Sequence, residues 1–433
     1  MTKGGQGNGV KPLLDDCFAH DPKRMPAADA LAALRARVAV MVESEPVPLQ
    51  EAYGCFLAET VSSGRDVPSF DNVAVDGYAF AHSSLTADAP TKLALAEGRA
   101  AAGHPFEGRV SAGQAARVLT GGALPDGTDT ALMQEDITVE GENVLIPKGV
   151  RRGANCRLAG EDMRTGQTVL QAGLRLRPQE VGVAATVGRT SLQVYQPLRV
   201  ALVSSGDELR EPGEPLPHGM TYDSNRTILR GLLEGLGVSV SDQGIWPDRA
   251  DVVQANMTRL AGDHHVIITS GGASRGDEDH MVDAIRALGR LHFWQIAVKP
   301  GRPLAFGQLQ GSKGDTVFIG LPGNPVAAVI CFLLFARPML TALGGGIWPT
   351  PRSFLVPADF SLKKKPGRRE YLRAKWHQDA KGAQSVTRIE REGSGILTSL
   401  TEADGLIDIA EETIVVAPGD PVPFIPFSEF GLW

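Results

Sequence analysis

The most regular hydrophobic pattern lies in residues 199–346, where short apolar runs alternate with segments of helical period. Arg199–Ser205 and Val266–Thr269 are largely apolar, as is typical of strands buried on both faces, and Val238–Ile245 is a further predicted strand. After Tyr222-Asp-Ser-Asn225, apolar residues recur every three or four positions, which indicates a helix. Strands that alternate with helices in this way predict a doubly wound, mostly parallel α/β sheet.

The same pattern predicts where several helices lie. Ser224 suits the N-cap of the helix that follows it, and Gly237 suits its stop. Helical period also covers residues 24–43, and a shorter helix is expected over Leu49–Leu57. The longest apolar run, Val326–Ala336, is shorter than the roughly 20 residues that span a bilayer, so we expect a buried core helix and no membrane partner.

Two other regions show the short alternating runs of β-structure. Between residues 80 and 155 these runs are broken by Gly and Pro, and Glu140-Gly-Glu-Asn143 is typical of a hairpin turn. Residues 352–433 contain strand-like runs at Val386–Glu390 and Gly405–Ala410, and they predict a compact β-domain. The chain is therefore expected to be multidomain, α/β plus β.

Composition narrows the classes of function. The chain has 433 residues, more than one core usually holds, with 42% hydrophobic and 21% charged residues. A net charge of −7 lacks the basic footprint of a nucleic-acid binder. The four cysteines have no paired spacing, which favours reduced thiols and a cytoplasmic location. The first ten residues have no apolar segment and are expected to form a disordered tail.

Candidate chemistry begins just after Val266–Thr269. Gly271, Gly272 and Gly276 follow this strand, and glycines there let backbone N–H groups approach an anion. The acids at 277–279 come next, and acids beside such a loop suggest a hard cation such as Mg²⁺. The alternative is a plain glycine loop that leads into an acidic helix start, and this stretch alone favours neither interpretation.

Acids also follow two other predicted strands. Glu208, Asp248 and Asp279 each come after a different strand of the α/β region. Each alone is more often a helix cap or a solvated acid. Because the carboxyl ends of parallel strands share one edge of a sheet, their combination favours a site there.

Two further segments are expected at the same edge. Lys299-Pro-Gly-Arg-Pro303 places two cations around a proline-fixed turn, which could hold an oxyanion or could simply be a solvated basic turn. Asn324 suits an N-cap and Pro325 the first helical position, which makes a helix N-terminus that favours anions or serves structure alone. In the β-rich region, the Asp76-Gly77 pair resembles an ordinary turn, and the loop at Thr120 could be a turn or could face a ligand.

Taken together, these segments resemble the molybdopterin molybdenumtransferase family, which includes MoeA and the E domain of gephyrin. The resemblance covers the chain from about residue 12 onwards. Any one motif is weak, but all of them in this order are specific. They are Phe70-Asp-Asn-Val-Ala-Val-Asp-Gly-Tyr-Ala79, Thr120-Gly-Gly, Ser205-Gly-Asp-Glu-Leu209, Tyr222-Asp-Ser-Asn225, Lys299-Pro-Gly-Arg-Pro303 and Gly320-Leu-Pro-Gly-Asn-Pro325.

The resemblance implies a homodimer with a cleft between subunits, in which the inserted β-domain faces the partner's cleft. It implies a reaction in which molybdate is inserted into adenylyl-molybdopterin, with Mg²⁺-dependent release of AMP, downstream of a molybdopterin adenylyltransferase. The implied domains are a discontinuous helical linker (11–60 and 157–197), an inserted β-rich domain (61–156), an α/β molybdopterin-binding domain (198–346) and a C-terminal β-barrel (347–433).

The resemblance also assigns roles to individual residues. The implied catalytic positions are Asp76, Thr120, Glu208, Asp248 and Asp279, of which the last three would manage Mg²⁺. The implied molybdate-binding positions are Lys299, Arg302, Pro303, Arg373 and Ser394. The implied phosphate- or pterin-facing positions are Ser205, Gly206, Gly271, Gly272, Ser274, Gly323 and Asn324.

This sequence departs from the family at several positions. Gln295 stands where many members have lysine, and Ala327 replaces a frequent serine. Arg302 replaces a commoner lysine and so keeps charge but changes its geometry. A molybdopterin adenylyltransferase would lack the flanking β-domains, and a gephyrin-like scaffold would carry a further fused domain. The transferase interpretation therefore fits best.

Overall fold

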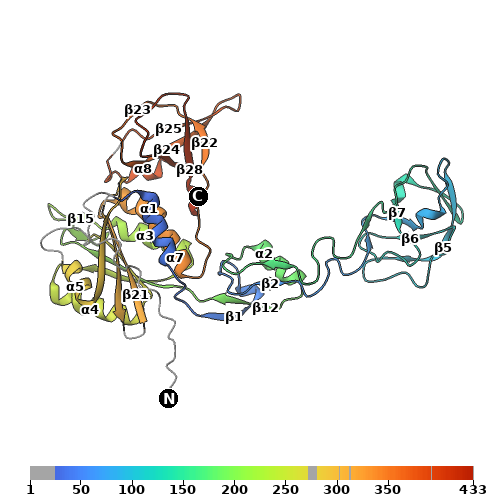
Figure 1. Cartoon of the computed structure of the whole chain (residues 1–433), viewed down its shortest axis with the longest axis horizontal. Coiled ribbons are helices and arrows are strands. Elements are labelled where there is room, and N and C mark those ends of the chain that lie inside the picture. Colours follow the sequence, from blue (N-terminus) through green and yellow to red (C-terminus); the bar gives the residue numbers. More distant parts are fainter. Residues whose placement is uncertain (1–24, 272–279, 302, 312–313, 392, 433) are drawn as a thin grey trace, which may run out of the picture.

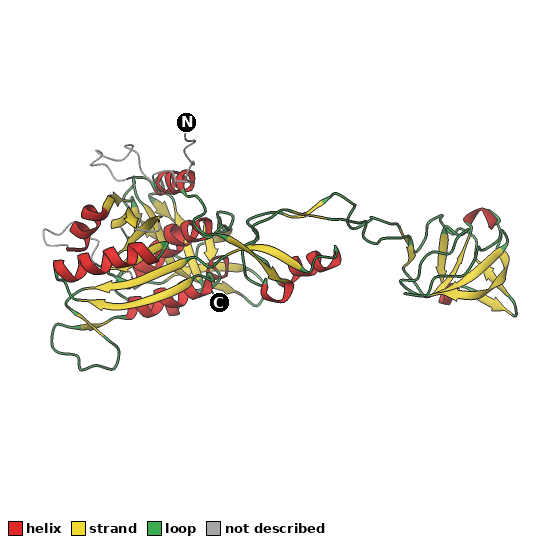
Figure 2. Ribbon diagram, turned by 90° about the horizontal axis from the view of Figure 1, so that it is seen from below, coloured by secondary structure: helices red, strands yellow, loops and turns green. Residues whose placement is uncertain are grey.

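The structure is a computed structural model that describes residues 25–271, 280–301, 303–311, 314–391 and 393–432. For residues 291–295 and 303 it describes the backbone alone. The predicted tail, residues 1–10, lies outside the described part. The molecule is elongated, with a β-rich domain at one end and the α/β and C-terminal domains at the other (Figure 1). A narrow segment of paired strands joins the two ends (Figure 2).

The α/β domain is built on one six-stranded sheet in the order β16-β13-β17-β21-β20-β18. The first four strands are parallel, while β20 and β18 are antiparallel to their neighbours. This confirms the doubly wound, mostly parallel fold. The strands are β13 (Arg199–Ser205), β16 (Ser239–Trp246), β17 (Val266–Ser270), β18 (Gly289–Gln295), β20 (Pro303–Gly311) and β21 (Gly314–Leu321).

Helices cover both faces of this sheet, and each face has its own core. One core joins the sheet to α1, α3, α6 and α7, and the other joins it to α4 and α5. Figure 1 shows these two groups on opposite sides of β21. The helices are α1 (Ala27–Arg37), α3 (Ser224–Gly235), α4 (Ala250–Asp263), α5 (His280–Leu288), α6 (Pro325–Cys331), the π-turn η4 (Phe332–Ala336) and α7 (Arg337–Leu343).

The apolar run at 326–336 extends further as a helix than its sequence indicates. The continuous helical segment Pro325–Leu343 has 19 residues, which is long and apolar enough to cross a membrane by length and composition. However, 83% of its most apolar window is buried inside the protein, among the side chains of the larger core. The prediction of a buried core helix is confirmed.

The start of α3 differs from the prediction. The helix begins at Ser224, and its N-cap is Asp223, whose carboxylate accepts a hydrogen bond from the Arg226 backbone N–H. Both residue types cap helices, and here the carboxylate is placed by its additional ion pair with the Arg226 side chain. Gly237, with a φ of +76°, follows the helix as predicted.

The segments expected to form a helical linker contain strands as well as helices. Helix α1 packs in the larger α/β core, and the helix expected over Leu49–Leu57 is wrong, since the structure has only the 3₁₀ turn η1 (Leu49–Glu51). Leu57 is instead bridged to Val194 across the linker, where pairing between distant segments overrides local helical propensity. The linker elements are β1 (Ser44–Pro48), β2 (Val61–Ser62), β10 (Cys156–Arg157), β11 (Thr168–Leu170), α2 (Pro178–Thr186) and β12 (Ser191–Tyr195).

The distal domain contains a six-stranded sheet in the order β7-β4-β6-β5-β9-β8. The predicted hairpin is confirmed, since Glu140 and Asn143 are paired across a two-residue turn. The strands are β3 (Asn72–Val73), β4 (Gly77–Phe80), β5 (Thr91–Ala100), β6 (Gln114–Val118), β7 (Thr130–Met133), β8 (Thr138–Glu140) and β9 (Asn143–Ile146), with 3₁₀ turns η2 (His82–Ser84) and η3 (Gln134–Asp136).

The C-terminal domain is a small barrel. Its strands run in the order β24-β26-β28-β22, β25 pairs with β24, and a bridge from Ala358 to Val386 closes the ring. The short strand β19 (Val298–Lys299) of the α/β domain pairs with β24 and joins the two domains. The elements are β22 (Phe354–Pro357), β23 (Leu362–Lys363), β24 (Arg369–Gln378), β25 (Gln384–Arg388), α8 (Thr398–Thr401), β26 (Gly405–Ile409), β27 (Val415–Val416), β28 (Pro421–Pro426) and η5 (Phe427–Phe430).

Candidate active site

A cavity of about 500 Å³ opens at the carboxyl ends of β13, β17 and β21. This is the edge at which open α/β sheets bind ligands. Hydroxyl, amide and carboxylate groups line much of it, and the start of α6 and the barrel loop at Gly395 close one side. The lining residues are Ser205, Glu208, Leu209, Thr221, Tyr222, Asp223, Ser224, Asn225, Ser270, Gly271, Gly323, Asn324, Pro325 and Gly395.

Glu208 and Asp223 are the two acids among the described residues that line this cavity, and Asp223 is buried at the N-cap of α3. Glu208 follows β13, and its backbone carbonyl accepts a hydrogen bond of 2.8 Å from the Thr221 N–H. Its carboxylate folds back over Gly206, where a Cβ atom would lie 2.5 Å from Glu208 Oε2. The predicted positions Ser205, Gly206 and Glu208 therefore act together, because glycine at 206 leaves room for this carboxylate.

Asn225 and Ser270 belong to the cavity although sequence reasoning gave neither a role. The Asn225 side-chain amide donates to Ser270 Oγ and to the Gly323 carbonyl, both at 2.7 Å. Its Oδ1 atom is buried and has no hydrogen-bond partner among the described residues. A buried acceptor without a donor is costly unless a ligand or water completes it. The only sequence signal for Asn225 was its place in Tyr222-Asp-Ser-Asn225.

The glycine loop after β17 is described only at its first residue. Gly271 has a φ of +80°, and a Cβ there would lie 2.6 Å from the Ser205 carbonyl oxygen, so a larger residue would push β13 and β17 apart. Gly323, which follows β21, lies next to Gly271, since a Cβ built on Gly323 would be 3.9 Å from Gly271 Cα. The predicted site residues Gly272, Ser274 and Asp279 lie outside the described residues.

Asp248 follows β16, the strand beside β13, at the same edge of the sheet as Glu208. Its backbone N–H donates to the Asp207 carboxylate at 3.3 Å, which ties the two strand ends together. Asp248 is not among the residues that line the cavity. Within the described ranges, no three His, Cys, Asp or Glu side chains are close enough to hold a metal ion by themselves.

The Lys299 turn meets the barrel beside this cavity. The Lys299 ammonium lies 3.5 Å from Glu370 Oε2, and Arg368 lies 2.9 Å from the other oxygen of the same carboxylate. Glu370 is 2% exposed, so this buried acid holds two cations at the domain boundary. Gly301 packs against α6, where a Cβ would meet Cys331 Sγ at 2.4 Å. Arg302 lies outside the described residues, and Pro303 begins β20.

Arg373 and Ser394 are brought together by the barrel. Arg373 is 7% exposed and donates to the backbone carbonyls of Arg391 and Gly393, at 2.8 and 3.1 Å. These bonds shape the loop that carries Ser394, whose carbonyl accepts a hydrogen bond of 3.0 Å from the Val326 N–H at the start of α6. Arg373 therefore supports the loop that closes the cavity at Gly395.

Asp76 directly precedes β4 and Thr120 follows β6, both in the distal domain. This domain lies at the opposite end of the molecule from the α/β domain (Figure 1). Asp76 Oδ1 accepts hydrogen bonds from the Thr120 N–H and from its hydroxyl, both at 2.8 Å. The backbone bond and then the side-chain bond lower the pKa of the Asp76 carboxyl, which is exposed to solvent. Asp76 and Thr120 form one unit, but this chain does not bring them to Glu208.

Two of the departures from the family, Ala327 and Gln295, lie in described segments, and Asn324 lies beside Ala327 at the start of α6. Ala327 is buried in the third position of α6, close to Gly301 of the Lys299 turn, so a serine there would be enclosed by protein. Asn324 is the N-cap of this helix, yet its side chain makes no capping hydrogen bond and lines the cavity instead. Gln295 ends β18, of which the backbone alone is described.

The fold and the cavity define a ligand-binding α/β protein with flanking β-domains, and comparison with known proteins specifies the class. Residues 201–342 match the family described as "Probable molybdopterin binding domain". Residues 25–188 match the "MoeA N-terminal region (domain I and II)", and residues 356–427 match the "MoeA C-terminal region (domain IV)".

Individual relatives belong to the same family as these matches. A molybdopterin molybdenumtransferase of Haemophilus influenzae is 34% identical over 388 residues, which cover 89% of this chain and 94% of the relative. Molybdopterin molybdenumtransferase 2 of Mycobacterium tuberculosis is also 34% identical, over 86% of this chain and 92% of its own. A crystal structure of the molybdopterin biosynthesis MoeA protein from Pyrococcus horikoshii OT3 superposes with a TM-score of 0.78 at 28% identity, over 93% of this chain and all of the other.

The chain belongs to the molybdopterin molybdenumtransferase family, whose members are transferases of molybdenum cofactor biosynthesis. Both flanking regions match their family models, so the prediction of a transferase over an isolated adenylyltransferase domain is confirmed.

Proposed function

We propose that this chain inserts molybdate into adenylyl-molybdopterin, with Mg²⁺-dependent release of AMP and formation of molybdenum cofactor. The observation that carries the proposal is the cavity at the carboxyl ends of β13, β17 and β21, with Glu208 and Asn225 in its wall. Its polar lining and its size suit a phosphorylated ligand, for which backbone N–H groups after strands and at a helix start are general binding elements.

The residues around the cavity have separate proposed roles, which follow from the chemistry of each side chain. Asn225, with an unsatisfied buried Oδ1, would accept a hydrogen bond from a donor group of the pterin or adenine. Gly271 and Gly323 leave the backbone open where a phosphate has to approach. The phosphoanhydride between molybdopterin and AMP would lie toward Glu208, and its cleavage by water would release AMP.

The carboxylate oxygens proposed for the metal site fit a hard cation. Mg²⁺ prefers oxygen ligands and usually keeps several waters while binding one or two carboxylates and substrate phosphates. Glu208 and Asp248 supply carboxylates at the ends of neighbouring strands, and Asp279 is the third acid proposed to hold the metal. When bound, Mg²⁺ would neutralise charge that develops on the phosphate oxygens.

Molybdate is a tetrahedral dianion, so cations and hydroxyls should bind it. The proposed set is Lys299, Arg302, Pro303, Arg373 and Ser394, at the boundary between the α/β domain and the barrel. Glu370 holds Lys299 in place from the barrel side. This carboxylate also offsets part of the positive charge, which would keep molybdate binding reversible.

The elongated shape supports a homodimer. Asp76 and Thr120 belong to the distal domain and Glu208 to the α/β domain. These domains lie at opposite ends of the molecule, so the pair would contribute to the cleft of a second copy (Figure 1). A symmetric pair would give two such composite sites. Asp76, with its lowered pKa, would there act as a fixed acceptor toward the substrate of the other subunit.

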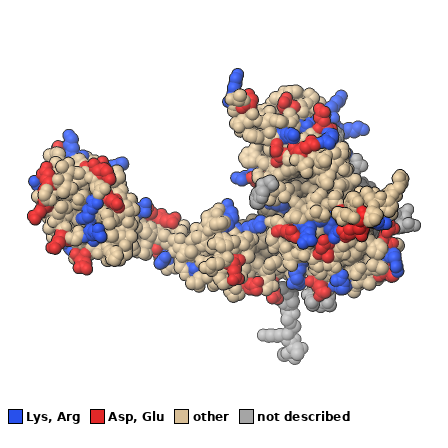
Figure 3. Space-filling view, turned by 180° about the vertical axis from the view of Figure 1, so that it is seen from behind, with Lys and Arg blue, Asp and Glu red and all other residues tan. Residues whose placement is uncertain are grey.

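Other proposed relations follow from the reaction. An upstream molybdopterin adenylyltransferase would supply the adenylylated substrate. The free cysteines Cys55, Cys156 and Cys331 support a reducing, cytoplasmic location. On the face drawn in Figure 3, basic and acidic side chains are interspersed, and we propose neither nucleic acid nor membrane as a partner.

The experiment is an AMP-release assay with purified protein and adenylyl-molybdopterin. AMP should appear only when molybdate and Mg²⁺ are both supplied, and Glu208→Gln should lose this release while it keeps the melting temperature. Release without molybdate would contradict the proposed reaction. No release together with tight binding of a peptide partner would favour a gephyrin-like scaffold instead.

A further inference from the structure

Glu208 is carried on a loop, residues 206–222, that leaves the sheet after β13 and returns to the start of α3. The two ends of this loop pair with each other as the short strands β14 (Leu209–Arg210) and β15 (Thr221–Tyr222). Two hydrogen bonds between the ends, from Thr221 N–H to the Glu208 carbonyl and from Asp223 N–H to the Arg210 carbonyl, measure 2.8 and 3.0 Å. Whatever fixes this pairing also fixes the backbone of Glu208.

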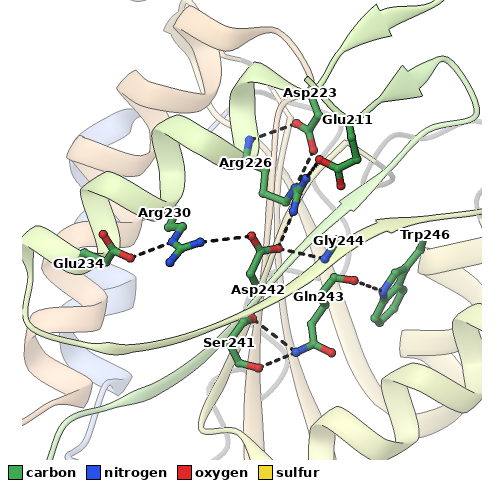
Figure 4. Close-up of polar contacts among 10 residues, drawn as sticks. All are labelled: Glu211, Asp223, Arg226, Arg230, Glu234, Ser241, Asp242, Gln243, Gly244 and Trp246. Atoms are coloured by element: carbon green, nitrogen blue, oxygen red, sulfur yellow. Dashed lines mark hydrogen bonds and ion pairs between the residues drawn. The ribbon is translucent and has the colours of Figure 1, made fainter. Parts of the chain in front are cut away.

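Arg226 lies in the first turn of α3, which follows the paired strands β14 and β15. Its guanidinium contacts three carboxylates from three elements, namely Asp223 at the helix cap, Asp242 on β16 and Glu211 in the loop (Figure 4). The bond from Arg226 Nε to Asp223 Oδ2 is 3.1 Å, and the bond from its Nη1 to Asp242 Oδ1 is 2.8 Å. The pair with Glu211 therefore joins the loop to a helix and to the sheet.

Burial makes this arrangement rigid. The side chains of Arg226 and Asp223 are 13% and 2% exposed. Because neither ion is well solvated, separating the pair would cost free energy. Burial of Arg226 opposes its charge, but the hydrogen bonds to Asp242 and Asp223 outweigh this and raise the pKa of Arg226. The guanidinium carries five N–H donors in a fixed planar fork, which suits it to bind three carboxylates at once.

Neither the fold nor the proposed chemistry otherwise accounts for Glu211. Its carboxylate is 43% exposed, it lies three residues after Glu208, and it does not line the cavity. An exposed acid on a surface loop usually contributes little. Here its partner is a nearly buried arginine that is already held by two other acids, so the loop is attached to a fixed point.

We propose that Arg226 is a positioning residue, which holds the 206–222 loop through Glu211 and thereby fixes the Glu208 carboxylate at the cavity. This rests on the proposed function for the role of Glu208, while the attachment of the loop can be measured without any activity. Arg226 does not line the cavity, and it acts on Glu208 through Glu211 and on a second residue of the cavity wall through Asp223.

The first test measures the loop alone, by hydrogen exchange. Because loss of Arg226 would leave the buried Asp223 unpaired and could unfold the domain, the variant of choice is Glu211→Ala, which leaves the Asp223 and Asp242 pairs intact. The amides of Thr221 and Asp223 should exchange about tenfold faster in this variant. Arg230→Met is the matched control, since Arg230 lies one turn on in the same helix and binds Glu234 and Asp242 but not the loop.

The second test is a double-mutant cycle on molybdate-dependent AMP release. Glu211→Ala should lower turnover about tenfold and raise the Mg²⁺ requirement in the otherwise unchanged protein, because a displacement near 1 Å is costly at a reacting centre. It should cause no further loss in Glu208→Gln, and the molybdate KM should stay constant.

Three results would overturn the proposal. They are unchanged amide exchange in Glu211→Ala, equal losses of turnover in both backgrounds, or full turnover with a loosened loop. A wild-type protein without AMP release would refute the proposed function instead, and the exchange measurement would still decide whether Arg226 and Glu211 hold the loop.

Discussion

The Asp76 carboxylate and Thr120 are joined by two hydrogen bonds of 2.8 Å, one from the Thr120 N–H and one from its hydroxyl. The same arrangement occurs in the linker, where Asp66 Oδ1 accepts from the Thr165 N–H at 2.8 Å and from its hydroxyl at 2.9 Å. An Asp–Thr unit of this kind is therefore also a general way to fix a loop, and its geometry alone does not establish catalysis. The pair at Asp76 needs a functional test in which the linker pair serves as control.

Subunit mixing gives that test. Asp76→Asn and Glu208→Gln should each lower AMP release about 100-fold if both groups act at the reacting centre. If the site is composite, mixed dimers of the two variants contain one intact site of two, and a random mixture should recover about a quarter of wild-type activity. Asp66→Asn in place of Asp76→Asn is the control and should retain activity without mixing. No recovery after subunit exchange would mean that Asp76 does not act in the partner's cleft.

Gly206→Ala should displace the Glu208 carboxylate. The new Cβ would lie 2.5 Å from Glu208 Oε2, a contact that forces the side chain to move. Turnover should fall about tenfold, with only the small loss of stability that a non-glycine residue at positive φ costs. Gly213→Ala is a matched control because Gly213, in the same loop, has a φ of +97° and nothing within 4 Å of its built Cβ. Equal turnover in the two variants would argue that the Glu208 carboxylate is not placed by Gly206.

Arg373→Ala should weaken molybdate saturation and loosen the loop at Ser394. The carbonyls of Arg391 and Gly393 would lose their donors, which costs about 1–3 kcal/mol of stability, and the molybdate KM should rise about tenfold. Arg373→Lys keeps the charge but cannot bind both carbonyls in the same geometry. If lysine restores the KM but not the stability, the charge acts on molybdate; if both stay impaired, Arg373 acts by shaping the loop. An unchanged KM in Arg373→Ala would remove it from the molybdate site.

Stability should fall with acid through His265. Burial, and then the charge of Arg199, lower the pKa of His265 from 6.5 to about 4, and its Nδ1 accepts a hydrogen bond of 3.0 Å from the Arg199 N–H. Since the folded protein binds this proton less readily than the unfolded chain, the contribution of His265 is complete above pH 6.5 and is lost as the pH falls toward 4. Because the ring is half-buried, we expect a loss of about 1–2 kcal/mol.

Urea unfolding between pH 7 and pH 4 measures this loss. His265→Asn should flatten the pH dependence of the free energy of unfolding, since the amide oxygen can accept from Arg199 but does not titrate. His264, whose pKa is also lowered by burial, titrates in the same sense, so His264→Asn is the parallel control. An equally steep pH dependence in His265→Asn would assign the acid sensitivity to other groups.

The sequence by itself determined the elements of the α/β domain. Local periodicity, together with residues that cap or end helices, predicts strands β13 and β17, helix α3 with its stop at Gly237, and the buried helix after Asn324. These signals act over a few positions, so they can be recognised without knowledge of the fold. For the same reason, acids and glycines after strands could be assigned to one edge of a parallel sheet before any coordinates were known.

Only the tertiary structure decided how distant segments meet. Strand pairing across the linker replaced the helix expected after Leu49, and α1 packs on the α/β core. Asn225 meets Ser270 and Gly323, and Arg226 reaches Glu211 and Asp242. The distal domain, which carries Asp76, lies at the opposite end of the molecule from the α/β domain, which carries Glu208. The contacts between segments join residues from 15 positions apart, as for Arg226 and Glu211, to 137 positions apart, as for Leu57 and Val194. They leave no local period in the chain, because they form only when distant elements pack against each other.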